Sequence, residues 1–130
     1  MDERDRYDKG MEVRRAVLGD AHVERSLRQR SPFTEEFQEL ITRHAWGEIW
    51  TRPGLSRHSR SLITVAMLLA LNRMDELRLH LRASANNGVS RDEIKELLLQ
   101  AAVYCGVPAA NQAFHLAEEV FEAMDRDGLL

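Results

Sequence analysis

The sequence predicts an all-α protein, a single-domain helical bundle that assembles into oligomers. Apolar residues recur at helical spacing in several segments, and no segment alternates apolar and polar residues as a β-strand does. Ser90 and Glu93 form an S-x-x-E capping box, which marks the start of a helix. We expect one domain over residues 1–130, with an N-terminal helical arm over about 1–30 and a core over about 31–125.

The first half of the chain predicts two helices. Residues 3–18 form a mostly polar helix with a thin apolar stripe, and residues 20–31 are expected to be a connector. A second helix begins near Thr34 and ends where Pro53 and Gly54 force a turn.

The second half predicts four further helices. The helix over 57–72 contains LITVAMLLAL, which is apolar on every side, as in a helix that is buried centrally or shared between subunits. The next helix runs from about Met74 to Asn87, and Gly88 is expected to take the left-handed conformation that ends it. The capping box then opens a fifth helix, and Pro108 lies early in the last one.

Composition narrows the possible partners and compartment. A net charge of −3 argues against nucleic acid as the main partner. The longest apolar run is about half the length of a membrane span, and the charged N-terminus differs from a signal peptide, so we expect no membrane partner. The one cysteine, Cys105, cannot form an internal disulfide, which favours the cytoplasm. Its neighbours are apolar, so we expect a small buried side chain rather than a nucleophile.

The histidines do not predict a metal site. No two of them have the H-x-x-x-H spacing of helical metal ligands, and one cysteine is too few for a structural zinc site. We therefore expect no metal. The five histidines are His22, His44, His58, His80 and His115.

An excess of arginine between Arg52 and Arg82 suggests an anionic ligand. This range contains six arginines and only two acidic residues, Asp75 and Glu76. The arginines either cover a helical surface with their aliphatic stems or create a local field for a small anion.

The stretch HAWGEIWTRPGL is a candidate binding site. It places Trp46, Glu48, Trp50 and Arg52 at the end of a helix that breaks into the Pro-Gly turn. Aromatic walls, one acid and one arginine suit a pocket for a small anion, because an arginine binds a carboxylate through two hydrogen bonds. The alternative is a helix end packed by tryptophans, with an ion pair on the surface.

His80 is a second candidate. On a helical wheel it flanks the stripe of Leu77, Leu81 and Ser84, so it does not simply point at water. A packed core histidine remains the alternative.

These stretches carry a resemblance. The patterns W-G-x-x-W-x-R-P-G-L and H-L-R-x-x-x-N-N-G resemble the γ-carboxymuconolactone decarboxylase family of the alkylhydroperoxidase-like superfamily, over nearly the whole chain. Alkylhydroperoxidases carry C-x-x-C-x-x-x-H on one helix, with Gly eight residues later. Here His80 and Gly88 keep that frame, but Arg73 and Glu76 occupy the cysteine positions. The thiol chemistry is therefore not inherited.

The resemblance implies an activity and roles for these residues. It implies a homohexamer that decarboxylates a small anionic lactone, 4-carboxymuconolactone, to the β-ketoadipate enol-lactone of protocatechuate catabolism, without a cofactor. His80 would be the general acid, since an unperturbed imidazole has a pKa of about 6.5, close to neutral pH. Arg52 would bind the substrate carboxylate, with Arg60 as a second candidate. Glu48 would orient His80 or press against the departing carboxylate. The pocket walls would be Trp46, Trp50 and Tyr104.

Two other functions stay open. One is an alkylhydroperoxidase-type thiol reductase on the same fold, which the lack of a second cysteine disfavours. The other is a non-catalytic oligomer that binds a metabolite of an aromatic pathway. An activity assay with purified protein separates this second alternative from the decarboxylase.

Overall fold

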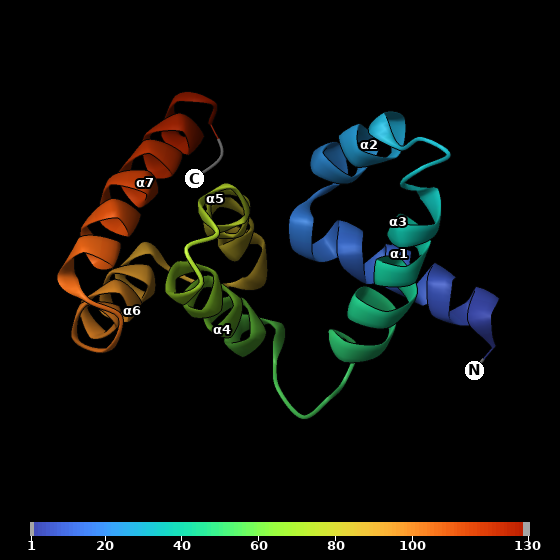
Figure 1. Cartoon of the computed structure of the whole chain (residues 1–130), viewed down its shortest axis with the longest axis horizontal. Coiled ribbons are helices and arrows are strands. Elements are labelled where there is room, and N and C mark those ends of the chain that lie inside the picture. Colours follow the sequence, from blue (N-terminus) through green and yellow to red (C-terminus); the bar gives the residue numbers. More distant parts are fainter. Residues whose placement is uncertain (1, 129–130) are drawn as a thin grey trace. The chain divides into compact units, whose positions relative to one another are not determined.

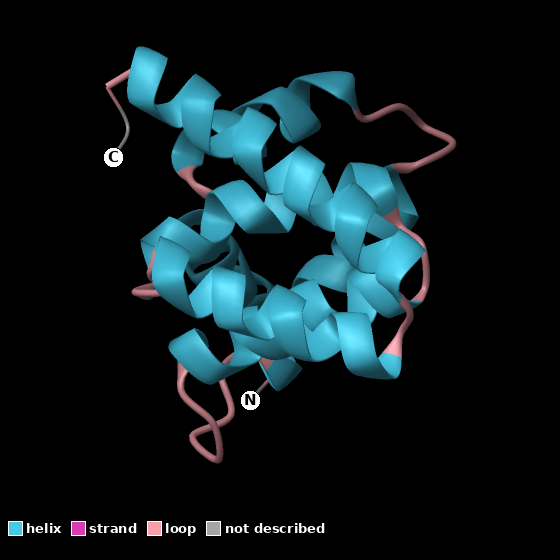
Figure 2. Ribbon diagram, turned by 90° about the vertical axis from the view of Figure 1, so that its left-hand side faces the viewer, coloured by secondary structure: helices cyan, strands magenta, loops and turns pink. Residues whose placement is uncertain are grey.

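Helices make up all the regular structure that a computed structural model describes over residues 2–128 (Figures 1 and 2). The all-α class is confirmed. The chain divides into two compact units, Met1–Ser56 and Arg57–Leu130. The predicted arm of residues 1–30 packs inside the first unit together with residues 35–49. The expectation of one domain over the whole chain stays a prediction.

In its described residues, the first unit has a helix where a connector was expected, and the helix predicted from Thr34 consists of two parts. The prediction of a connector over residues 20–31 is wrong, because helix α2 (Asp20–Gln29) forms there. Gly19 turns the chain before it with a φ of 93°, and Val23 on this helix is completely buried. The segment after residue 41 also continues as a π-helix. The elements are α1 (Glu3–Leu18), α2 (Asp20–Gln29), α3 (Glu35–Ile41) and the π-helix η1 (Thr42–Ile49).

Two glycines allow α1 and η1 to cross closely. A Cβ atom added to Gly10 would overlap the carbonyl oxygen of Thr42, and one added to Gly47 would overlap the carbonyl oxygen of Arg6. Only glycine permits this approach, since any larger residue would push the two backbones apart. The crossing fixes η1 against α1 and thereby fixes the HAWGEIW segment.

A buried arginine adds to this contact. Arg14 is only 5% exposed, and its guanidinium donates hydrogen bonds to Thr42 Oγ1 at 3.2 Å and to Gln38 Oε1 at 3.1 Å. Burial lowers the pKa of Arg14 from its ordinary value. A buried charge needs polar partners, and Arg14 finds them on α3 and η1. The two hydrogen bonds therefore link α1 to both of these helices.

The second unit follows the predicted helices closely. The left-handed Gly88 is confirmed, with φ 78° and ψ 16°, and so is the capping box, whose two bonds measure 2.9 and 3.1 Å. The core includes Leu69, Leu77, Leu81, Ile94 and Leu98, all nearly inaccessible to solvent. The elements are α4 (Arg57–Ala70), α5 (Met74–Ala83), the 3₁₀-helix η2 (Ser84–Asn87), α6 (Arg91–Tyr104) and α7 (Val107–Arg126).

Helix α4 is not buried on every side of one chain. Val65 and Leu69 face the core, but Ile63 is 39% exposed and Met67 is 58% exposed. The alternative of central burial is therefore wrong for the single chain, because α5, η2, α6 and α7 leave part of the α4 surface uncovered. Within residues 2–128, no helix has both the length and the apolar character needed to cross a bilayer.

Candidate functional site

Four of the predicted site residues lie on the π-helix η1 or directly after it. Trp46 and Glu48 are on η1, and Trp50 and Arg52 follow it. Trp46 is buried and Trp50 is half-buried, and their ring centroids lie 5.2 Å apart with the planes tilted by 32°. Arg52 is exposed just beyond the helix. π-helices are rare and occur often at functional sites. The structure thus brings Trp46, Glu48, Trp50 and Arg52 together in one short segment.

Glu48 has a partner that the sequence analysis did not assign to it. Its Oε2 lies 3.0 Å from Nδ1 of His44, and both side chains are exposed. The hydrogen bond from His44 lowers the pKa of the Glu48 carboxyl, and Arg6 and Arg52 lower it further, while partial desolvation opposes them. Glu48 is therefore a carboxylate at neutral pH. The suggestion that it orients His80 stays a prediction.

The other predicted residues lie on separate helices of the second unit. His80 is half-buried on α5 with its Nδ1 atom buried, next to the fully buried Leu77 and Leu81, as the helical wheel predicted. Arg60 is half-buried on α4, and its Nε atom is buried. Tyr104 ends α6 and is 82% exposed.

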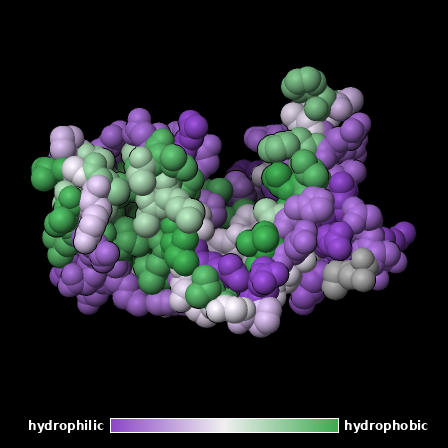
Figure 3. Space-filling view, turned by 60° about the horizontal axis from the view of Figure 1, so that its bottom comes forward, coloured by the Kyte–Doolittle hydropathy of each residue, from purple (hydrophilic) through white to green (hydrophobic). Residues whose placement is uncertain are grey.

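Tyr104 lines an apolar groove of about 630 Å³ between α4 and α6. Figure 3 shows apolar side chains gathered over this unit. The charged residues of the lining are Glu93 and Glu96, and in the described part of the chain neither Arg60 nor His80 lines it. The groove alone does not supply the cation that an anionic substrate needs.

Cys105 lies beside Tyr104 in the same groove and is exposed. The prediction of a buried thiol is wrong. Its neighbours in sequence are apolar, but α6 ends at Tyr104 with its last turn facing solvent, where Val103 is 79% exposed. Apolar neighbours therefore do not indicate burial at a helix end.

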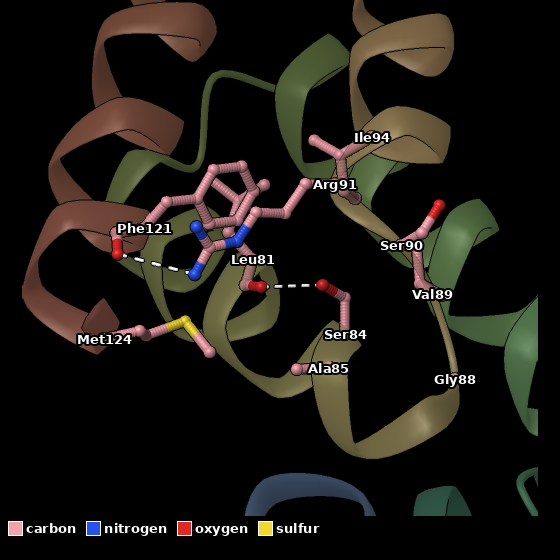
Figure 4. Close-up of a pocket in the computed structure, with 10 residues that line it drawn as sticks. All are labelled: Leu81, Ser84, Ala85, Gly88, Val89, Ser90, Arg91, Ile94, Phe121 and Met124. Atoms are coloured by element: carbon pink, nitrogen blue, oxygen red, sulfur yellow. Dashed lines mark hydrogen bonds between the residues drawn. The ribbon is translucent and has the colours of Figure 1, made fainter. Parts of the chain in front are cut away.

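A smaller cavity of about 260 Å³ lies between η2, α6 and α7 (Figure 4). The guanidinium of Arg91 stacks over the Phe121 ring at 4.7 Å and donates to both oxygens of Asp125, at 3.1 and 2.7 Å. The same contact lowers the pKa of Asp125. Since this arginine is already neutralised, the cavity is poorly suited to a second carboxylate. None of the predicted site residues lines it.

Two histidine–glutamate pairs were missed. The spacing of His44 and Glu48, four residues apart on a helix, was a usable signal for the first pair. His58 Nε2 lies 2.7 Å from Oε2 of Glu93, but 35 residues separate these two, so no local pattern reveals the pair. The pKa of Glu93 is lowered first by the backbone N–H of Ser90 and then by His58.

Known proteins resemble this chain closely. Residues 35–119 match the carboxymuconolactone decarboxylase family. The chain is 58% identical over 122 residues to the 4-carboxymuconolactone decarboxylase of Acinetobacter baylyi, which covers 94% of this chain and 91% of that protein. It is 46% identical over 118 residues to the nitrosuccinic acid decarboxylase npaB of Metarhizium robertsii, covering 91% and 82%. A 48-residue match to the 4-carboxymuconolactone decarboxylase of Pseudomonas putida is 67% identical and covers 37% and 100%.

Proposed function

This chain belongs to the carboxymuconolactone decarboxylase family, and we propose that it decarboxylates 4-carboxymuconolactone to the enol-lactone of β-ketoadipate. It is a carboxy-lyase of protocatechuate catabolism. The observation that carries this function is the similarity, over nearly the full length of both chains, to a decarboxylase of that name.

The substrate can supply its own electron sink. When the C–CO2 bond breaks, the electron pair moves through the ring double bond to the lactone carbonyl and gives a furan-like oxyanion. A proton added to the carbon next to that carbonyl then gives the enol-lactone. We therefore propose that no cofactor is needed, although many decarboxylations use one as the sink. The protein must bind the carboxylate that stays, donate toward the oxyanion and deliver the proton.

Arg52 and His80 are our candidates for the first and last of these tasks. Arg52 is exposed two residues after Trp50, and in this proposal it binds a carboxylate that packs against the tryptophan rings. Arg60, half-buried on α4, is a second candidate for the same task. His80 is the proposed general acid, because imidazole groups ordinarily exchange protons near neutral pH.

Glu48 fits one of its two proposed roles better. A lowered pKa makes it a poor proton donor but keeps it negatively charged. We propose that this charge repels the carboxylate that leaves as neutral CO2, so that the barrier falls as negative charge moves into the ring. Trp46, Trp50 and Tyr104 would wall the pocket.

The proposed assembly is a homohexamer that shares α4 between subunits. The support is the exposed apolar surface of the second unit, which includes Ile63, Met67, Val103 and Tyr104 (Figure 3). Light scattering at micromolar concentration should give six times the mass of one chain, and Met67→Glu should reduce it. A stable monomer would contradict the proposal. A cytoplasmic location is also proposed, on the basis of the single cysteine.

A second substrate is favoured by the relative named for nitrosuccinic acid. Both molecules are succinates with an electron acceptor on the carbon that loses CO2: the unsaturated lactone in one and the nitro group in the other. In each, a second carboxylate stays one methylene away. We propose that this chain also decarboxylates 2-nitrosuccinate, leaving the electron pair on the nitro group as a nitronate, which takes a proton at carbon to give 3-nitropropanoate.

An assay with both substrates tests these proposals. Purified protein should release CO2 from 4-carboxymuconolactone and form the enol-lactone, followed by NMR against a protein-free control. Binding in a calorimeter without CO2 release would indicate the non-catalytic metabolite-binding function instead. Turnover of the lactone with no acceleration for 2-nitrosuccinate would overturn only the second substrate. 2-Nitropropanoate, which lacks the second carboxylate, should be accelerated far less.

A further inference from the structure

The pair of His44 and Glu48 has a defined proton arrangement. Nδ1 of His44 lies 3.0 Å from Oε2 of Glu48. An ionised carboxylate can only accept hydrogen bonds, so Nδ1 of His44 carries the proton that is shared with it. The bond therefore persists whether or not the imidazole is charged.

The backbone under this pair is held rigidly. Gly47, between His44 and Glu48, packs so closely on Arg6 of α1 that it leaves no room for a side chain. Thr51 Oγ1 also donates to the carbonyl oxygen of Gly47 at 3.0 Å, which ties down the end of η1. The remaining freedom of Glu48 is the rotation of its own side chain, and this is the freedom that the bond to His44 removes.

The charges that face Glu48 come from three places. His44 lies on η1, Arg6 on α1, and Arg52 just after η1. Arg6 also pairs with Glu3. Among the other charged groups of α3 and η1, Arg43 pairs with Glu39 and also with Glu3 of α1. The two remaining carboxylates, Glu35 and Glu36, lie in the first turn of α3.

We infer that His44 is a positioning residue for the decarboxylation, which holds the Glu48 carboxylate in the place from which it acts on the departing carboxylate. This inference rests on the proposed function. A fixed negative charge acts on the reacting centre only if its distance and direction are constant, because preorganised charges need no rearrangement during the reaction. A freely rotating Glu48 would swing toward Arg6 or Arg52 and lose this effect.

Two substitutions separate positioning from other roles. His44→Ala removes the hydrogen-bond donor, whereas His44→Asn keeps an N–H near the place of Nδ1 but cannot titrate. We expect His44→Ala to lower kcat about three- to tenfold with little change in KM, in line with the loss of one solvent-exposed hydrogen bond. His44→Asn should restore most of kcat. His115→Ala, at an exposed histidine of α7, is the matched control and should leave both constants unchanged.

The pH profile gives an independent readout. Glu48 acts in its ionised form, so activity is present above its pKa and is lost as the pH falls through it. His44 contributes to the low pKa of Glu48, so its removal raises that pKa. The acidic limb of kcat/KM should therefore move to higher pH in His44→Ala. It should move less in His44→Asn, which keeps a donor.

Other outcomes would overturn the inference. Unchanged kcat and an unmoved acidic limb in His44→Ala would mean that the bond is irrelevant to catalysis. An equal loss in both variants with no shift of the limb would make His44 a proton donor itself. In a Glu48→Gln background, His44→Ala should have no further effect, and a full additional loss would also contradict positioning. If the wild-type protein proves inactive, an NMR titration of the Glu48 carboxyl still tests the pair: its pKa should rise in His44→Ala.

Discussion

His44 and His80 lie in different surroundings. His44 is exposed on the π-helix of the first unit and is held by a carboxylate. His80 is half-buried on α5 in the second unit, where the fully buried Leu77 and Leu81 flank it. Loss of the Glu48 carboxylate would release the His44 side chain, whereas an amide of similar volume at position 80 can keep the packing beside Leu77 and Leu81. Substitutions that keep shape should therefore affect chemistry at His80 without unfolding the protein.

The largest effect is expected at His80. His80→Asn or His80→Gln should lower kcat by about 10²–10⁴, the usual contribution of a positioned proton donor. The free energy of unfolding should fall by about 1 kcal/mol or less, because an amide keeps much of the volume and some hydrogen bonds. CO2 release and thermal melting, measured on one preparation, check both statements.

Two other results would change the role of His80. A large loss of stability with normal turnover in the folded fraction would make it a core histidine. If CO2 release survives but solvent deuterium enters the product without preference for one face, His80 protonates the ring after CO2 has left. In that case His80 would act after CO2 has left, whereas Glu48, which His44 positions, would act while the C–CO2 bond breaks.

Arg52 should give the next largest effect. Arg52→Ala should lower kcat/KM by about tenfold to a hundredfold, since a charge-assisted bond to a carboxylate is lost. Most of the change should be in KM, with a smaller part in kcat, because binding remote from the reaction also positions the reacting carbon. Arg28→Ala, at an exposed arginine of α2, is the control and should leave kcat/KM unchanged. Equal values for the two variants would remove Arg52 from the site.

The two units should also differ in how they tolerate a methyl group on glycine. Gly47→Ala should destabilise the protein by about 1–3 kcal/mol or more, because the added Cβ atom would overlap the α1 backbone and force the two helices apart. Gly88→Ala should cost about 1–2 kcal/mol, since open space surrounds that position and only the left-handed backbone is strained. Denaturant unfolding measures both. A smaller loss at Gly47 than at Gly88 would contradict the tight crossing of α1 and η1.

Local rules predicted the second unit better than the first. Gly88, the capping box and Pro108 each act within one turn of chain, so the sequence shows them directly. The close crossing of α1 and η1 depends on Gly10 and Gly47, and Arg14 is buried with its hydrogen bonds to Gln38 and Thr42. Such contacts join residues 24 or more positions apart, and no local pattern encodes them.

The candidate site shows the same division. The cluster of Trp46, Glu48, Trp50 and Arg52 was predictable because its members are adjacent in sequence. The pairing of Glu48 with His44 was overlooked although its spacing was visible. The exposure of Cys105 could not be read from its apolar neighbours, because burial depends on which face of α6 the other helices cover.

The smallest effect is expected at Cys105. Cys105→Ser should keep kcat/KM within a few-fold, because the proposed chemistry uses no thiol and an exposed serine replaces the cysteine without creating a cavity. Neither form should reduce peroxides, since Arg73 and Glu76 stand where the thiol reductases of the superfamily carry their cysteines. Peroxide consumption and CO2 release, assayed side by side, check this. A large loss of decarboxylation in a folded Cys105→Ser would contradict this and show that the thiol takes part in the reaction, next to the pocket wall proposed for Tyr104 in the same groove.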